Sequence, residues 1–168
     1  MKRFEGQKTI ALFALSALLF ALPASAQSLQ DKLAGTWIVE SVVNEQEGKK
    51  IEPFGPKPVG YFIFTRDGHY SFQIVRPDRP KFAANNKNKG TSEENKQAIE
   101  GTVTIFGTYK ISDETNGTIS LHVVGSNFPN WDGTDQVRKV SISGDDMTYT
   151  NPSGAIGGTV VQKLRRAK

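Results

Sequence analysis

The residues best suited to chemistry lie in one stretch, His122 to Arg138, where polar side chains interrupt two runs that otherwise read as β-strands. Successive side chains of a strand point to opposite faces, so His122 and Arg138 each occupy one defined face. If both faces point inward, an imidazole and a guanidinium form a polar wall in an apolar interior. Arginine is the natural bidentate partner of a carboxylate. The stretch therefore predicts a site for a small molecule with an anionic or carbonyl group.

Two further polar residues belong to this predicted ligand site. Gln136 shares a strand face with Arg138, and Tyr109 at the end of the preceding strand can add a hydroxyl. An enzymatic alternative is a cofactor-free isomerase or cyclase, in which His122 shuttles a proton while Arg138 or Tyr109 stabilises an oxyanion. A structural role is the competing interpretation, because half-buried strands often hold paired arginines, and a one-residue shift in register would move these groups outside.

Other chemistries find little support in the residue types. The chain has no cysteine, and its two histidines, His69 and His122, belong to no cluster with metal-ligand spacing. It has neither a glycine-rich phosphate loop before a helix nor a Gly-x-Ser-x-Gly nucleophile motif. We therefore expect no metal, no cofactor and no nucleophilic hydrolase.

Short runs rich in Val, Ile, Thr, Tyr and Phe alternate with turn residues along the chain, a pattern typical of an all-β protein. Eight such runs favour an antiparallel up-and-down barrel, whose closure leaves an interior that side chains fill or that holds one small ligand. The predicted strands are 34–43, 59–65, 69–76, 102–112, 118–126, 136–143, 146–151 and 158–165.

The sharpest local prediction is a hairpin around Asp67-Gly68, a pair that favours a two-residue type I′ turn. This turn sets Ile63 opposite Phe72 and Tyr61 opposite Ile74, all on one face. We expect that face to point inward, so that Tyr61, Phe72 and Ile74 line the ligand cavity.

Two segments interrupt the strand pattern. Residues 77–101 form a polar insertion in which Thr91 to Glu94 is a capping-box motif, so a short helix is expected over 92–99. The insertion is either a lid over one mouth or a solvated connector. The aromatic loop Phe128 to Trp131 either lines the mouth or packs on the barrel edge. A third functional class, a protein-binding module of inhibitor type, would act through these loops.

The first 26 residues have the layout of a secretory signal peptide. Basic residues precede an apolar run from Ile10 to Leu22, and the small residues of Ala24-Ser25-Ala26 follow it. The run is too short for a membrane span, which needs about 20 residues. We expect cleavage after Ala26, a single mature domain over 27–168, no stable membrane anchoring, and a periplasmic or secreted location.

The charge balance of the expected mature domain excludes one class of partner. Without residues 1–26, 18 Lys and Arg face 16 Asp and Glu, a net charge of +2. This small excess is scattered and offers no stripe that could follow a phosphate backbone. We expect a monomer that binds a small molecule and not nucleic acid.

Six short segments, taken in order, resemble the single-domain lipocalin-like family of bacteria and fungi. They are Gly35-Thr-Trp37, Pro53 to Tyr61, Asp67-Gly-His69, Arg76 to Pro80, Phe106-Gly-Thr-Tyr109 and the stretch from His122 to Arg138.

The resemblance implies an up-and-down barrel in which Trp37 closes one end under a basic residue of the last strand, such as Arg165. The chain departs from animal lipocalins, since Thr134-Asp135 is followed by Gln136 rather than tyrosine and the cysteine bridge is missing. The ligand classes of those proteins therefore do not carry over.

Overall fold

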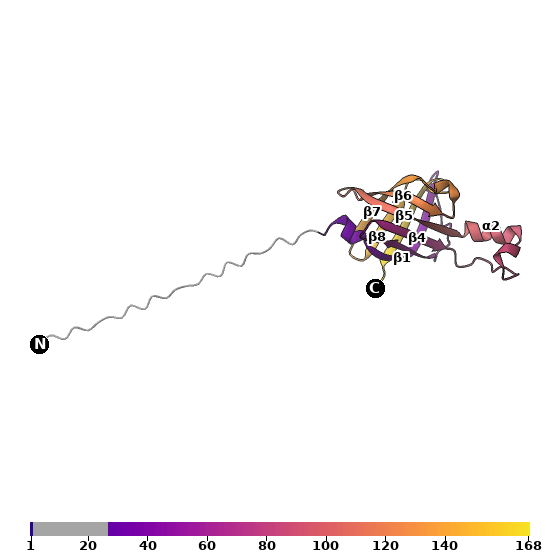
Figure 1. The fold of residues 1–168 in the computed structure, drawn as a ribbon, viewed down its shortest axis with the longest axis horizontal. Helices are drawn as coiled ribbons and strands as arrows, with labels where there is room; N and C mark the ends of the chain where they lie inside the picture. Colours follow the sequence, from indigo (N-terminus) through magenta and orange to yellow (C-terminus); the bar gives the residue numbers. More distant parts are fainter. Residues whose placement is uncertain (2–26) are drawn as a thin grey trace.

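A sheet of antiparallel strands closes on itself when its first long strand pairs with its last (Figure 1). The computed structural model describes Met1 and residues 27–168. The predicted signal peptide, apart from Met1, lies outside the described residues. The strands are β1 (Gly35–Gln46), β2 (Lys49–Ile51), β3 (Val59–Phe64), β4 (His69–Val75), β5 (Thr102–Asp113), β6 (Thr118–Ser126), β7 (Asp135–Ser143), β8 (Asp146–Asn151) and β9 (Thr159–Arg166).

The predicted all-β, eight-stranded up-and-down barrel is confirmed. From β3 to β9 each strand pairs with the next, and β1 closes the ring by pairing with β3 on one side and β9 on the other. The short strand β2 only extends the far end of β1. It was not predicted, because its three residues are all exposed and carry no alternating pattern.

The barrel interior is packed at one end by aromatic rings. Phe62 stacks on Phe72 with ring centroids 4.1 Å apart, and Tyr149 meets Phe62 edge-on at 5.1 Å. Phe64 adds a T-shaped contact with Phe72 at 5.0 Å. These offset and edge-on geometries are the favourable ones for aromatic pairs. Side chains therefore fill the half of the barrel where β3 ends and β4 begins.

The hairpin between β3 and β4 differs from the prediction by one residue. Its loop has three residues, Arg66–Gly68, closed by a hydrogen bond from the Thr65 amide to the His69 carbonyl at 2.9 Å. Only Gly68 has a positive φ (88°), whereas a type I′ turn requires positive φ at both central residues. Phe62 therefore lies opposite Phe72, and Phe64 lies opposite Tyr70.

This register corrects one face of β3. Phe62 and Phe64 point inward, while Tyr61 and Ile63 lie on the outer wall. The prediction that Tyr61 lines the cavity is wrong, and Tyr61 is 49% exposed. For β4 the expected inward orientation of Phe72 and Ile74 is confirmed.

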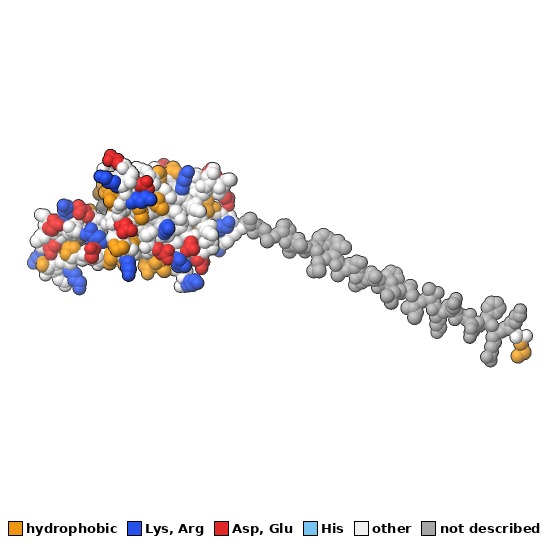
Figure 2. All heavy atoms as spheres, turned by 180° about the vertical axis from the view of Figure 1, so that it is seen from behind, with side chains coloured by type: hydrophobic (Ala, Val, Ile, Leu, Met, Phe, Trp, Pro, Cys, Tyr) orange, Lys and Arg blue, Asp and Glu red, His pale blue; other side chains and the backbone are white. Residues whose placement is uncertain are grey.

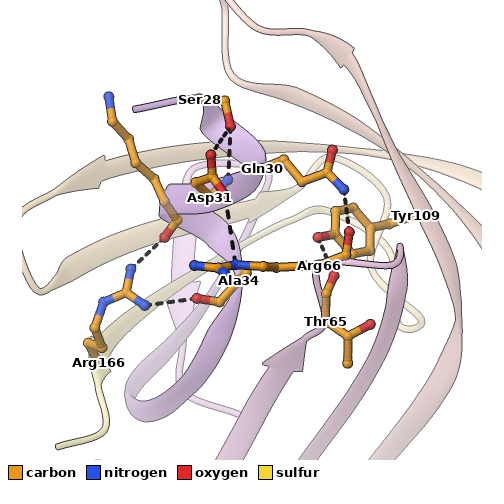
Figure 3. A network of polar contacts seen from close by, with 9 residues as sticks. Ser28, Gln30, Asp31, Ala34, Thr65, Arg66, Tyr109 and Arg166 are labelled. Atoms are coloured by element: carbon orange, nitrogen blue, oxygen red, sulfur yellow. Dashed lines mark hydrogen bonds and ion pairs between the residues drawn. The ribbon is translucent and has the colours of Figure 1, made fainter. Parts of the chain in front are cut away.

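The closed end of the barrel is sealed by helix α1 (Leu29–Leu33), Trp37 and Arg166, and Figure 3 shows Arg166 reaching the end of α1. The indole of Trp37 is fully buried and donates to the Leu33 carbonyl at 2.8 Å. The Arg166 guanidinium lies over the indole at 4.1 Å and donates to the carbonyls of Lys32 and Ala34, at 3.0 Å for Ala34. One arginine thus joins a cation–π contact to hydrogen bonds at the C-terminal end of α1.

The residue over the indole is therefore Arg166, and the prediction of Arg165 for this role is wrong. Arg165 is adjacent along β9, so its side chain points to the opposite face. It lies on the outer wall, where it pairs with Glu40 at 2.7 Å and Asp146 at 3.4 Å.

The insertion between β4 and β5 forms an arm that projects from the end of the barrel opposite α1 (Figure 1). It contains η1 (Lys87–Lys89) and α2 (Ser92–Glu100), and α2 begins with the predicted capping box of Thr91 and Glu94. Arg79 donates to Thr102 at 2.6 Å and to the Arg76 carbonyl at 2.9 Å. These bonds fix the base of the arm to β5.

The outer wall carries both signs of charge. Figure 2 shows basic and acidic side chains interspersed with apolar ones on the face drawn there. Within the described residues, no helix is long and apolar enough to cross a membrane.

Replacing Arg166 by glutamine should lower the free energy of unfolding by about 2 kcal/mol, since a cation–π contact and charged hydrogen bonds are lost together. Urea denaturation followed by tryptophan fluorescence measures this change. The matched variant Arg165→Gln should cause a clearly smaller change, because it removes only exposed ion pairs. Equal losses in the two variants would contradict the assignment of Arg166 to the closed end.

Candidate functional site

A cavity of about 270 Å³ occupies the open end of the barrel, opposite Trp37. Its walls are mostly apolar, with a few amide side chains at defined places. The apolar lining includes Val42, Phe54, Ile74, Val103, Trp131 and Val160, and the amides are Asn44, Asn127, Asn151 and Gln162. An apolar pocket with few polar groups is the usual form of a small-molecule site.

The loop between β6 and β7 forms part of the mouth. Asn127 ties this loop to β5 by accepting from the Thr104 amide and donating to the Thr102 carbonyl, both at 2.8 Å. Phe128 and Trp131 then meet edge-on with centroids 5.4 Å apart, beside η2 (Pro129–Trp131). Trp131 both lines the cavity and packs against the core. The loop thus both lines the mouth of the barrel and packs against the barrel, the two roles that the sequence left open.

The insertion contributes to the mouth only through its last turn. Ile99 and Glu100, at the end of α2, line the cavity. The rest of the arm projects away from the barrel (Figure 1). The arm therefore borders the opening and does not cover it in this structure.

A second, smaller void of about 40 Å³ lies deeper in the barrel. It shares Ile74, Trp131 and Gln162 with the lining of the mouth cavity, so the two spaces are neighbours. Phe72, Tyr149 and Arg138 form its deeper wall. A space of this size holds one water molecule or one small polar group.

Arg138 is the only buried charged side chain in the described residues, with 5% of its surface exposed. It projects inward from β7, donates to its neighbour's carbonyl at Val137 (2.8 Å), and also donates to the amide oxygen of Gln136. No Asp or Glu among residues 27–168 lies within ion-pair distance of it. The positive charge is therefore held by neutral groups alone, in a place where charges are normally paired.

Two tyrosines add hydroxyl groups near Arg138. The hydroxyls of Tyr70 and Tyr149 are buried, and within the described part of the chain neither has a partner with hydrogen-bond geometry. Burial raises the pKa of Tyr70 to about 12, and the positive charge of Arg138 acts in the opposite direction. Burial also raises the pKa of Tyr149, again opposed by Arg138. Both hydroxyls keep their protons at neutral pH and can donate to an anion.

His122 lies on the outer wall, so the prediction that it faces the interior is wrong. On β6 the inward positions belong to Ile119, Leu121 and Val123, which leaves His122 facing solvent with its side chain 52% exposed. Its Nδ1 lies 2.8 Å from Oδ1 of Asp135, the residue opposite it on β7. The proton shuttle of the isomerase alternative is thus separated from the cavity by the barrel wall.

The remaining predicted residues divide between the two ends of the barrel. Gln136 lies on the inward face of β7 and accepts from Arg138, so these two are brought together as expected. Tyr109 also points inward, but it lies toward the closed end, where its hydroxyl donates to the Thr65 carbonyl at 2.7 Å (Figure 3). Its hydroxyl is therefore engaged away from the mouth.

Tyr149 and Gln162 are among the residues lining the inner void that the sequence analysis did not predict. The sequence signal that could have identified them is the alternation of inward and outward side chains along their strands. Met147, Tyr149 and Asn151 alternate inward on β8, and Val160, Gln162 and Leu164 do so on β9. A glutamine between two apolar inward positions is the kind of interruption that marks a site.

Among residues 27–168 no three His, Asp or Glu side chains come close enough to hold a metal ion. The donors gathered around Arg138 suit an anion, since guanidinium and phenol groups offer protons.

The high pKa of Tyr70 makes the fold sensitive to alkaline pH. Between pH 10 and 12 the native state keeps the Tyr70 proton while the unfolded chain releases it, so the free energy of unfolding falls as the pH rises. Tyr70→Phe should therefore lose stability less steeply than the wild type over this range. Urea denaturation at several pH values measures both slopes, and parallel slopes would contradict the burial of a protonated Tyr70.

The comparisons with known proteins agree with this geometry. The model of the lipocalin-like domain family matches residues 34–158, which include the barrel from the start of β1 to the loop before β9. No curated protein matches the chain. Closure of β1 onto β9 and a tryptophan at the sealed end are the features that the resemblance implied. The chain belongs to the lipocalin-like domain family.

Proposed function

We propose that this protein is exported to the periplasm or the medium and binds a small amphipathic ligand in the open end of its barrel. The apolar part of the ligand occupies the mouth cavity, and its anionic or carbonyl group reaches the inner void beside Arg138. The observation that carries this proposal is the buried Arg138 guanidinium, which has no acidic partner within residues 27–168. The layout of the first 26 residues supports export.

Electrostatics favours an acid over a neutral group. A buried charge without a counter-ion costs free energy, because the protein interior solvates it less well than water does. A ligand carboxylate supplies the missing negative charge and accepts hydrogen bonds from Arg138 and from the hydroxyl of Tyr149, which also lines the inner void. Binding then removes the free-energy cost of burying the Arg138 charge without a counter-ion.

The dimensions favour a compact ligand. The mouth cavity of about 270 Å³ lies just below the usual range for drug-sized ligands, and the inner void adds room for one polar group only. A medium-chain acid such as decanoate is therefore a suitable probe.

Binding is favoured over acid–base catalysis by the residues around the inner void. The residues that line it include no Asp, Glu or His, so no side chain there can serve as a general base. Glu100 lies at the mouth, at the end of α2 and outside the inner void.

Arg138→Met should weaken decanoate binding by about 10- to 100-fold, the range for losing a hydrogen-bonded charge pair. Decanol has the same chain length without the charge, and its affinity should stay the same or rise. Isothermal titration calorimetry measures both affinities. Arg165→Met, on the outer wall, and His122→Ala should bind both compounds as the wild type does.

An equal loss of affinity for decanoate and decanol in Arg138→Met would contradict the proposal, because it would show a general structural defect. Failure of the wild type to bind either compound would also contradict it. Native mass spectrometry of protein purified from its own host provides an independent check, since a carrier should retain an unmodified acidic compound.

A further inference from the structure

We propose that Gln162 forms a second polar subsite, at the junction of the two cavities, and that the ligand is an apolar carboxylic acid with a hydroxyl group close to its acid group. This inference rests on the proposed function, since it refines the ligand class of the same site. It is carried by the position and the unsatisfied amide of Gln162.

Gln162 is placed at the junction by its strand. It projects inward from β9 between Val160 and Leu164 and lies opposite Tyr149 on β8 and Val42 on β1. Its side chain lines both the mouth cavity and the inner void that contains Arg138. A ligand that reaches from the mouth to Arg138 therefore passes this amide.

The amide oxygen of Gln162 has no hydrogen-bond partner in the described part of the chain. The residue is 8% exposed, and within residues 27–168 its Oε1 accepts no hydrogen bond. The oxygen of the neighbouring Asn44 amide also has no partner among these residues, but its Nδ2 donates to the Gly157 carbonyl at 2.9 Å and so holds the loop before β9. Among the residues that the structure describes, no such bond holds the Gln162 side chain. A buried polar group without a partner costs free energy, which a ligand group can remove.

A hydroxyl group is the ligand group that fits this position. The Gln162 amide accepts a hydrogen bond through Oε1 and donates one through Nε2, and a hydroxyl group can bind to either atom, since it both donates and accepts. Tyr149, opposite Gln162, lines the same space, and its hydroxyl also has no hydrogen-bond partner among residues 27–168. The ligand hydroxyl would thus contact two groups from adjacent strands.

The small inner void sets the distance between the two polar groups of the ligand. Arg138 and Gln162 both line a space of about 40 Å³, roughly the room that one carboxylate or one water needs. A carboxylate held by Arg138 therefore leaves the Gln162 amide beside the next few carbons of the ligand. A 3-hydroxy acid satisfies both groups, whereas an acid with a distant terminal hydroxyl does not.

The test compares decanoate with each enantiomer of 3-hydroxydecanoate by isothermal titration calorimetry. Wild-type protein should bind one enantiomer about tenfold more tightly than decanoate, the gain from one well-placed hydrogen bond to a buried group. Gln162→Met keeps the length of the side chain but removes the amide, so this preference should disappear while decanoate binds at least as well. The control Gln73→Met alters a glutamine on the outer face of β4 and should keep the preference.

Equal wild-type affinities for decanoate and both hydroxy acids would overturn the inference and leave the proposed function standing if decanoate binding still depends on Arg138. A preference that persists in Gln162→Met would also overturn it. If the wild type binds none of these acids, the proposed function fails and the inference fails with it. Circular dichroism confirms folding, and Gln162→Leu provides a second apolar variant if Gln162→Met does not fold.

Discussion

The buried positive charge of Arg138 is the constraint on which the account of this barrel depends. The guanidinium is surrounded by neutral acceptors and by two protonated tyrosines, and no acid among residues 27–168 compensates it. A fold tolerates such a charge only because packing elsewhere holds it in place. The same arrangement gives the interior a positive potential, since few solvent molecules screen it.

The closed end supplies that packing. Trp37, held by the Leu33 carbonyl and by Arg166, seals one end, and the ring cluster around Phe62 fills the space behind it. The cavity therefore lies at the opposite end, lined by Trp131 and by the last residues of the α2 arm. The two arginines have opposite roles: Arg166 stabilises the closed end, and Arg138 leaves hydrogen-bond donors free inside.

Much of the fold could be predicted from the sequence, because strand alternation and turn residues are local signals. All eight predicted strands are present, and so is the capping box of α2. The direction in which the side chains of a strand point was harder to predict where both of its faces carry polar and apolar residues. On β7 the inward Gln136 and Arg138 were placed correctly, yet on β6 the apolar series Ile119, Leu121 and Val123 should have placed His122 outside.

Register and cross-strand neighbours account for the other errors. Asp67-Gly68 is compatible with a two-residue or a three-residue loop, and the choice depends on which face of β3 the core accepts. The contacts of Phe62 and Phe64 with Phe72 favour the three-residue loop. Such contacts depend on the three-dimensional packing and are not visible in the local sequence. The meeting of Tyr149 with Gln162 likewise depends on strand pairing, so the sequence alone did not reveal the junction between the cavities.

The most direct measurement of the central claim is the ionisation of a bound acid. Decanoate labelled with ¹³C at its carboxyl carbon reports its own protonation by NMR as the pH is lowered. A carboxylate beside the Arg138 guanidinium should stay ionised well below the pKa of the free acid, and Arg138→Met should abolish this shift. A bound carboxyl that titrates like the free acid in wild-type protein would contradict the account.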